Sequence, residues 1–474
     1  MTVNILSSLP TRARLFSVRP STLTKITITN RTAAAHFSVC ASSRMASHPQ
    51  SPPPAPSIAP ENGAADVTSA PAYKPRYIDI GINLADPIFR GVYHGKQRHD
   101  DDLSGLVDRA RQVGCTKLIV TGSSFKTSRE ALAIAKEYPG TVFTTAGIHP
   151  CSSSIFDPAH PHSHEEDGDG EHTPACGPDP DKPIPDDAKA IDPEKTETII
   201  SDLRRLVEDA RGPGPQQQLV AFGEFGLDYD RLHYCPRSLQ LHSFRAQLSL
   251  AASLSPQLPL FLHSRAAHGD FVACLKAAFG ERLERLEKGG VVHSFTGTVE
   301  EMRELMDLGL YIGLNGCSFK TAENCEVVRA VRLDRLMIET DGPWCEVRPT
   351  HEGWKYLVEI DKKEKAAAEA SEAALRDQAN QVNGDAVPPP AAKQPPKKQQ
   401  SMKKPQKKES EVIERFKTVK KEKWVEGAMI KGRNEPCMIE RVAKIVAGIK
   451  GVSIEEVCEA AWQNTAKVFG IDET

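Results

Sequence analysis

Short apolar segments alternate with amphipathic stretches along most of the chain. Each apolar segment has roughly four to six largely apolar residues, the length of a buried strand, and is followed by helical periodicity. Such unbroken apolar runs are typical of parallel strands that are buried on both faces. The pattern predicts strands within 77–83, 116–122, 142–150, 218–228, 258–265, 289–297, 310–316 and 335–343.

The number of these strand–helix units favours a closed barrel. Eight units are what a TIM-type barrel requires, and the segments 438–451 and 453–470 supply closing helices. A doubly wound open sheet is the alternative, but the first predicted strand is not followed by a glycine-rich phosphate-binding turn. We therefore predict an α/β fold, a (β/α)8 TIM-type barrel within residues 73–470.

The first 72 residues are predicted to be a disordered tail outside the barrel. Residues 1–60 contain arginines and many Ser and Thr, and the first acidic residue is Glu61. This composition is typical of a mitochondrial transit peptide, although a plain disordered tail is the alternative. Met45 offers a second start that would remove the signal. We expect an intracellular protein, mitochondrial and/or cytoplasmic or nuclear.

Two low-complexity insertions are predicted to interrupt the barrel. Residues 157–192 are acidic and rich in Pro and Gly, as expected of a disordered surface loop. Residues 361–410 begin as a charged, Ala-rich, helix-like run and end in a lysine-rich tract at 393–408. Such a tract can contact phosphates electrostatically; a solubilising linker and a nuclear address are the alternatives.

Composition excludes several classes of protein. The formal net charge is −3, and no run of 18 apolar residues exists, so no membrane span is expected. The 11 cysteines are scattered and form no C-x-x-C pair, which argues against a cysteine zinc site and a disulfide framework. We expect reduced thiols and a monomer.

Polar residues follow the apolar runs at the predicted carboxyl ends of the strands. In a barrel these ends converge on one face, where the chemistry takes place. Two imidazoles and two carboxylates on that face suit Mg²⁺, Mn²⁺ or Zn²⁺. A single histidine there is more often a satisfied core residue, but a set of such groups favours a metal site. The polar residues are Asp79, Asn83, His149, Glu224, His263, His293, Glu339 and Asp341.

Five motifs, in this order, resemble those of the TatD family of metal-dependent deoxyribonucleases, within the metal-dependent hydrolase superfamily. They are "GEFGLDYDR", "FLHSR", "HSFTG", "ETDGPW" and "RNEP". The segments "IDIGIN" and "THEGWKYL" resemble the eukaryotic branch. The resemblance covers roughly residues 76–156, 194–358 and 411–470.

The resemblance implies one or two divalent ions bound by Glu224, His263, His293 and Asp341, with Mg²⁺ the expected ion. It places His149 at the lining of the cleft. We expect His149 and Arg265 to contact substrate phosphate; the alternative for Arg265 is an ion pair with a nearby acid. Many relatives carry His-x-His on the first strand, where this chain has Gly81 and Asn83. Two ligands are therefore absent, and Glu224 either bridges two ions or anchors one.

The resemblance further implies hydrolysis of DNA phosphodiester bonds, with 3′–5′ exonuclease activity. Asp341 is expected to bind the ion and accept the proton of the attacking water, and Glu224 to anchor the ion. Asp228 is expected to cap or orient its loop. The alternatives are hydrolysis of an ester or amide on the same barrel, and a catalytically weak protein that binds nucleic acid.

Overall fold

Eight parallel strands form one sheet, with the strand order β1-β4-β5-β6-β7-β8-β9-β10. Each lies within a predicted segment, except that β4 begins one residue earlier than predicted. The computed structural model describes residues 73–159, 181–186, 191–211, 218–382 and 412–471, all within the compact unit Pro71–Thr474. The strands are β1 (Tyr77–Ile82), β4 (Cys115–Val120), β5 (Val142–Ala146), β6 (Leu219–Asp228), β7 (Leu260–Arg265), β8 (Gly290–Val292), β9 (Tyr311–Leu314) and β10 (Leu336–Ile338).

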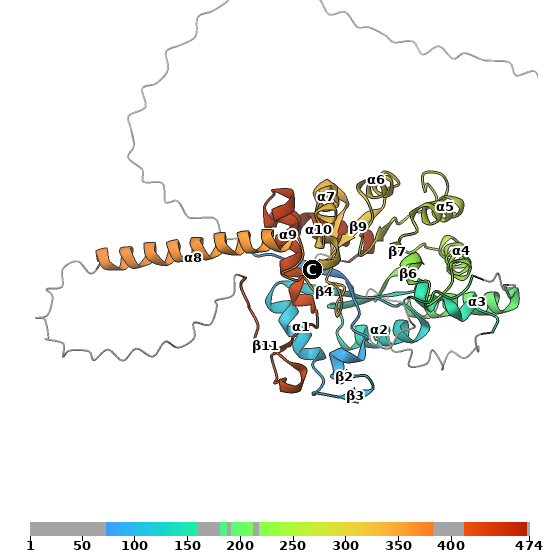
Figure 1. Cartoon of the computed structure of the whole chain (residues 1–474), viewed down its shortest axis with the longest axis horizontal. Helices are drawn as coiled ribbons and strands as arrows, with labels where there is room; N and C mark the ends of the chain where they lie inside the picture. The colour runs from blue at the N-terminus through green and yellow to red at the C-terminus, as the bar shows by residue number, and fades with distance from the viewer. Residues whose placement is uncertain (1–72, 160–180, 187–190, 212–217, 383–411, 472–474) are drawn as a thin grey trace, which may run out of the picture. The chain divides into compact units, whose positions relative to one another are not determined.

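Helices separate most of the strands in sequence and surround the sheet (Figure 1). Two short strand pairs, β2–β3 and β11–β12, were not predicted. The helices are α1 (Leu103–Gln112), α2 (Phe125–Glu137), α3 (Pro193–Ala210), α4 (Arg237–Ser253), α5 (His268–Phe279), α6 (Val299–Asp307), α7 (Ala322–Ala330), α8 (Trp354–Val382), α9 (Ile439–Lys450) and α10 (Ile454–Phe469). The short strands are β2 (Val92–Tyr93), β3 (Lys96–Gln97), β11 (Thr418–Val419) and β12 (Met429–Ile430).

Hydrogen bonds between the first and last strand segments bring the sheet to a nearly closed barrel. The Asp341 amide donates to the Gly81 carbonyl at 2.8 Å, and the Asn83 amide donates to the Gly342 carbonyl at 2.8 Å. The buried Asp79 carboxylate accepts the Thr340 amide at 2.9 Å and the Thr340 hydroxyl. The TIM-type prediction is confirmed, and Asp79 belongs to the seam.

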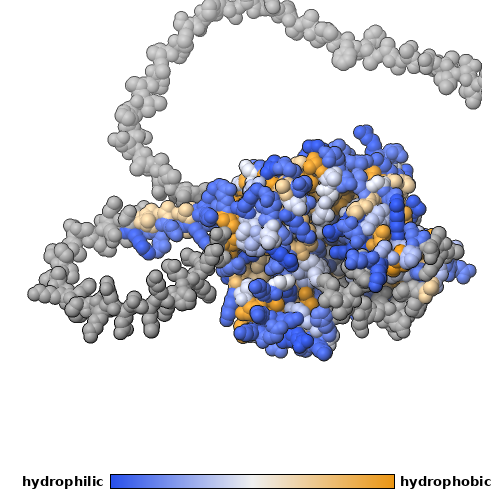
Figure 2. All heavy atoms as spheres, in the orientation of Figure 1, coloured by the Kyte–Doolittle hydropathy of each residue, from blue (hydrophilic) through white to orange (hydrophobic). Residues whose placement is uncertain are grey.

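The barrel has an inner and an outer core. The inner core contains Ile80 and Met337, and α10 adds Trp462 and Phe469. The outer core lies between the strands and the helices. On the face seen in Figure 2, hydrophobic residues form small areas separated by hydrophilic ones. Within the described residues, no helix combines the length and apolar character needed to cross a membrane.

The structure revises the predicted insertions. Helix α8 continues to Val382, so residues 361–382 are helical rather than disordered, as the Ala-rich beginning of this segment indicated. Lys444 of α9 binds the first half of α8 through Asp361 at 2.8 Å and Glu364 at 2.8 Å, while residues 365–376 are exposed. In the first insertion, Asp192 caps α3. The tail 1–72, residues 160–180 and the tract 393–408 lie outside the described residues.

The motif "RNEP" forms a buried ion network. Arg433 contacts Asp102 and lies 2.8 Å from Glu435, and Arg109 of α1 lies 2.8 Å from each of the same carboxylates. All four side chains are at most 2% exposed. Between Arg433 and Glu435, the Asn434 amide group donates to the Thr340 and Trp344 carbonyls, both at 2.8 Å. The motif therefore supports the loop that carries Asp341.

We predict that Arg433→Met destabilises the protein strongly, because it leaves two buried carboxylates with one cation. Breaking a buried ion pair from one side costs about 3–5 kcal/mol. The matched control is Arg329→Met, whose partner Glu326 is 63% exposed, and this variant should lose at most about 1 kcal/mol. Urea unfolding followed by circular dichroism measures both. Equal midpoints for Arg433→Met and the wild type would contradict the assignment.

Candidate metal centre

Three imidazole nitrogens face one oxygen of Glu224 at the carboxyl end of the barrel strands. The distances to Glu224 Oε1 are 2.7 Å from His293 Nε2, 3.1 Å from His263 Nδ1 and 3.4 Å from His149 Nε2. His263 Nδ1 and His293 Nε2 lie 3.4 Å apart. Glu224 of β6 and His263 of β7 thus meet His149, which follows β5, and His293, which follows β8, as the sequence predicted.

Glycines in β6 allow this convergence. A Cβ atom on Gly226, where φ is +153°, would lie 1.8 Å from the His263 carbonyl oxygen, and one on Gly223 would lie 2.1 Å from that of Phe261. Any other residue at these positions would therefore separate β6 from β7. The close approach places Glu224 and Asp228 on either side of the His263 ring, which Glu224 contacts through Nδ1 and Asp228 through Nε2.

A second carboxylate lies behind each of the two central histidines. Asp228 Oδ2 is 3.1 Å from His263 Nε2, and Glu339 Oε2 is 3.5 Å from His293 Nδ1. Both carboxylates are 0% exposed. Asp228 accepts a hydrogen bond from His263 Nε2, so this outer nitrogen carries the hydrogen of a neutral His263 ring. Glu339 forms no hydrogen bond with His293, but its negative charge beside Nδ1 favours a hydrogen on that outer nitrogen. The inner nitrogens, His263 Nδ1 and His293 Nε2, then direct lone pairs toward Glu224.

This arrangement fits a cation, because two lone pairs and a carboxylate oxygen would otherwise repel one another. In the absence of metal, protons take that role. Burial opposes charge on both rings. Nevertheless, Glu224 and Glu339 raise the pKa of His293, and Asp228 and Glu224 raise the pKa of His263. Burial also opposes charge on Glu224, yet the histidines hold its pKa well below the ordinary range. One oxygen and two imidazole nitrogens are suitable ligands for a divalent metal ion.

His149 differs from the other two histidines in its tautomer. The Cys151 backbone amide donates to His149 Nδ1 at 3.1 Å, so this nitrogen carries no hydrogen. Burial lowers the pKa of His149 to about 3, which leaves a neutral ring with its hydrogen on Nε2. The ligand atoms of His149, Glu224 and His263 all lie within 4.8 Å of one another. Nevertheless, His149 presents a hydrogen-bond donor to the site, as a substrate contact requires.

Asp341 lies beside the cluster and is held by donors on both oxygens. Asn83 Nδ2 donates to Oδ1 at 3.1 Å, while Ser294 Oγ and Cys345 Sγ lie 3.4 Å and 3.3 Å from Oδ2. Burial raises the pKa of Asp341 to about 7, an effect that His293 opposes and that Glu339 and Glu224 reinforce. Asn83, which stands in place of a histidine, therefore positions Asp341.

Glu339 occupies the space left at the other missing histidine. A Cβ atom on Gly81 would lie 2.3 Å from Glu339 Oε2. The other oxygen, Oε1, accepts the Ser294 amide at 2.5 Å and the Asn315 side chain at 3.3 Å. Oε2 and His293 Nδ1 are both buried without a hydrogen-bond partner within the described residues. A glycine at position 81 therefore allows a carboxylate to support His293.

The basic residues at the rim partly match the sequence prediction. Arg265 is the predicted phosphate contact. Its Nε lies 3.0 Å from Asp230, so it forms the ion pair with an acid that was the alternative prediction. Sequence reasoning missed Arg231, whose Nε lies 3.7 Å from Asp228 and whose side chain is 45% exposed. It expected Asp228 only to cap or orient its loop, and it placed Glu339 on the same face without giving it a role. The "FGLDYDR" stretch carried the signal for Asp228 and Arg231, since it continues directly from Glu224.

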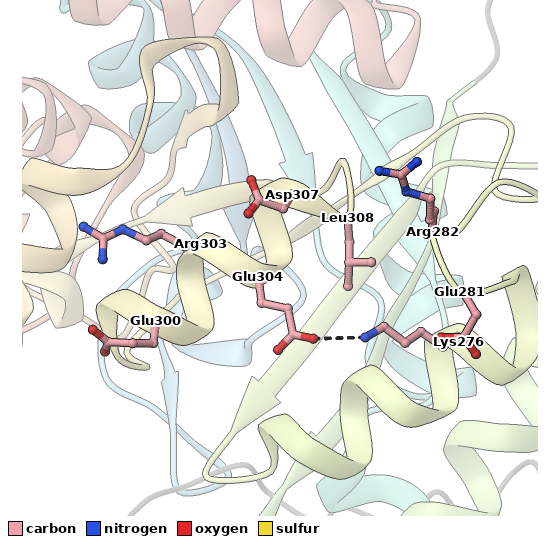
Figure 3. Close-up of a pocket in the computed structure, with 8 residues that line it drawn as sticks. All are labelled: Lys276, Glu281, Arg282, Glu300, Arg303, Glu304, Asp307 and Leu308. Atoms are coloured by element: carbon pink, nitrogen blue, oxygen red, sulfur yellow. Dashed lines mark hydrogen bonds and ion pairs between the residues drawn. The ribbon is translucent and has the colours of Figure 1, made fainter.

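A separate hollow lies among the outer helices. A groove of about 540 Å³ between α5 and α6 is lined mainly by charged residues, including the pair Lys276–Glu304 at 3.0 Å (Figure 3). Cations and anions are mixed in its lining, and none of the predicted site residues belongs to it. The groove therefore has no role in the metal centre.

We predict that the affinity for Mn²⁺, used as a probe ion, rises with pH between 6 and 8. The raised pKa values mean that His263 and His293 hold protons that metal must displace, so acid weakens binding and base strengthens it. Each displaced proton contributes up to about tenfold per pH unit. Calorimetric titration at several pH values measures the slope.

Glu339→Gln should make this slope shallower, because a neutral amide no longer holds the proton on His293. Glu304→Gln is the matched control, since Glu304 pairs with His268 at 2.9 Å on the outer helices and should leave the slope unchanged. An affinity that does not vary with pH would refute the lone-pair arrangement.

Comparison with known proteins agrees with this geometry. A family model described as TatD related DNase matches residues 78–383. The "Deoxyribonuclease Tat-D" of Schizosaccharomyces pombe is 39% identical over 395 residues, which cover 83% of this chain and 96% of the relative. The "3'-5' ssDNA/RNA exonuclease TatD" of Erwinia tasmaniensis is 33% identical over 56% of this chain and 79% of its own length.

The chain is also similar to a solved structure. A crystal structure described as an uncharacterized amidohydrolase from Saccharomyces cerevisiae matches with a TM-score of 0.61 and 30% identity, and the match covers 83% of this chain and 100% of that chain. The family match, the relatives and the barrel agree, and the chain belongs to the TatD-related DNase family.

Proposed function

We propose that this protein is a divalent-metal-dependent deoxyribonuclease that hydrolyses DNA phosphodiester bonds from the 3′ end. One observation carries the proposal: Glu224 faces two imidazoles, each of which has a second carboxylate behind it. The names of the fission yeast and Erwinia relatives support DNA as substrate. The enzyme is thus a metal-dependent hydrolase acting on phosphodiester bonds.

The proposed ligands of one resident ion are Glu224, His263, His293 and Asp341. The carboxylates and an anionic substrate suit Mg²⁺, and the imidazoles extend the choice to Mn²⁺ and Zn²⁺. When bound, such an ion lowers the pKa of water and neutralises charge on phosphoryl oxygens. A single ion is supported by Asn83, whose side chain is engaged with Asp341 and Gly342. Glu224 is then the anchor of one ion.

Asp341 is the proposed base that accepts the proton of the attacking water. A buried carboxyl with a pKa of about 7 is well matched to proton transfer at neutral pH. Hydrogen-bond donors on both of its oxygens hold the group in one orientation. Glu224, whose pKa is lowered, remains anionic and serves as the anchor.

His149, Arg265 and Arg231 are the proposed contacts to substrate phosphate. His149 presents its Nε2 hydrogen to the centre, and the side chains of Arg265 and Arg231 are 34% and 45% exposed at the rim. Guanidinium groups bind phosphate oxygens in pairs of parallel hydrogen bonds. Asp230 and Asp228 would hold these groups in place before substrate binds. The two guanidinium groups favour a phosphodiester over a neutral ester or amide.

We predict that the wild type trims 5′-labelled single-stranded DNA from its 3′ end with Mg²⁺ or Mn²⁺. Asp341→Asn should lower kcat by about 10²- to 10⁴-fold, because it removes the base. Glu224→Ala should lose both turnover and metal binding. Glu300→Gln, a change in the outer groove, is the matched control and should retain full activity. Denaturing gels resolve the products.

Other outcomes of this experiment separate the alternatives. Cleavage that survives both Glu224→Ala and Asp341→Asn would overturn the proposed mechanism. Tight DNA binding without cleavage by any form would favour a nucleic-acid-binding protein with a weak catalytic site. Turnover of an ester or amide panel, with none of DNA, would favour the other hydrolase chemistry on the same barrel.

We propose that the lysine-rich tract 393–408 contacts DNA phosphates. Because each neutralised phosphate releases counterions, deletion of the tract should flatten the dependence of DNA affinity on salt. Fluorescence anisotropy at several salt concentrations measures the slope, with deletion of residues 160–175 as the control. An unchanged slope after the first deletion rejects this contact. Import into mitochondria is likewise proposed, from the composition of residues 1–60 alone.

A further inference from the structure

Two cysteines from neighbouring loops meet beside the metal centre. Cys317 follows β9 in the short helix Gly316–Phe319, and Cys345 lies in the loop after β10. Because β9 and β10 pair in parallel, their carboxyl ends bring these loops together. The two Sγ atoms are 2.6 Å apart, and a Cβ atom on Gly316 would lie 1.8 Å from the Cys345 carbonyl oxygen.

The pair is connected directly to a proposed ligand. Cys345 Sγ lies 3.3 Å from Asp341 Oδ2, where its thiol hydrogen is donated. The other donors to this carboxylate are Asn83 and Ser294, at 3.1 Å and 3.4 Å. Asn83 binds Oδ1. Loss of the Cys345 thiol hydrogen therefore leaves Oδ2 with only the Ser294 contact at 3.4 Å.

We propose that Cys317 and Cys345 are an oxidation site, at which a peroxide converts the two thiols into a reversible disulfide that weakens the metal centre. A disulfide bond is about 2.05 Å long, so the sulfurs need only a small further approach. The effect on the metal centre rests on the proposed function; disulfide formation does not.

The reaction proceeds in two balanced steps. The Cys317 sulfur attacks one peroxide oxygen, the O–O bond breaks, and a sulfenic acid and one water form. The Cys345 sulfur then attacks the Cys317 sulfur, the S–O bond breaks, and a second water leaves with the thiol proton. Two thiols are oxidised and one hydrogen peroxide is reduced to two waters. A dithiol reductant reverses the change by thiol–disulfide exchange.

The surroundings of Cys317 assist the first step. Hydrogen bonding with Cys345, together with the charges of Lys320 and Arg265, lowers the pKa of Cys317 to about 6 against the effect of burial. The thiolate is the reactive form of cysteine. Cys151, which like Cys345 is partly exposed, differs, since burial raises its pKa to about 12. Oxidation is therefore directed to the pair.

The test compares reduced and peroxide-treated full-length protein. Peptide mapping without reductant should find the segments around Cys317 and Cys345 linked in the wild type, and dithiothreitol should separate them. Calorimetry with Mn²⁺ should give roughly fivefold weaker binding after oxidation, as expected of one lost hydrogen bond. Cys317→Ser should form no link and keep its affinity. Cys325→Ser, a change of a buried cysteine on α7, is the matched control and should behave as the wild type.

Each other result overturns part of the proposal in a defined way. Absence of the linked peptide in peroxide-treated wild type rejects the oxidation site, whether or not the protein cleaves DNA. A linked peptide with equal Mn²⁺ affinity in both redox states rejects the connection to the metal centre. Because neither readout requires turnover, failure of the nuclease proposal remains distinguishable from failure of this one.

Discussion

The structure depends on one electrostatic constraint: a buried carboxylate oxygen faces two imidazole lone pairs, so a cation must lie among them. Asp228 and Glu339 create this constraint, because Asp228 accepts a hydrogen bond from the outer nitrogen of His263 and the charge of Glu339 favours a hydrogen on the outer nitrogen of His293. Without those two carboxylates, either ring could turn a hydrogen toward Glu224 and satisfy it as a neutral donor. The outer carboxylates therefore turn a hydrogen-bonded cluster into a binding site for a positive ion.

The barrel supplies the precision that this arrangement needs. Glycines in β6 let two strands approach until Glu224 and Asp228 lie on either side of one imidazole. The seam hydrogen bonds of Gly81 and Asn83 fix the loop that carries Asp341, and the buried "RNEP" network supports that loop through Asn434. Residues outside the cluster thus determine the position of Asp341, the proposed base, and proton transfer depends on such positioning.

The sequence predicted the strands and the convergence of their ends well, because long apolar runs and barrel topology are local and regular features. It predicted poorly which side chains from different strands contact one another. Asp228 was expected to orient its loop; it does accept the Asp230 amide, but its second oxygen contacts His263. That Glu339 fills the space beside Gly81 depends on a distance between the first and last strands, which no local pattern encodes. For the same reason, sequence spacing could not reveal the contact between Cys317 and Cys345.

Anomalous diffraction from a crystal of the protein grown with Mn²⁺ tests the central claim most directly. One strong peak is expected within bonding distance of Glu224 Oε1, His263 Nδ1, His293 Nε2 and the Asp341 carboxylate, with His149 Nε2 outside the coordination sphere. A peak coordinated by His263 Nε2 or His293 Nδ1, or the absence of any peak at Glu224, would contradict it.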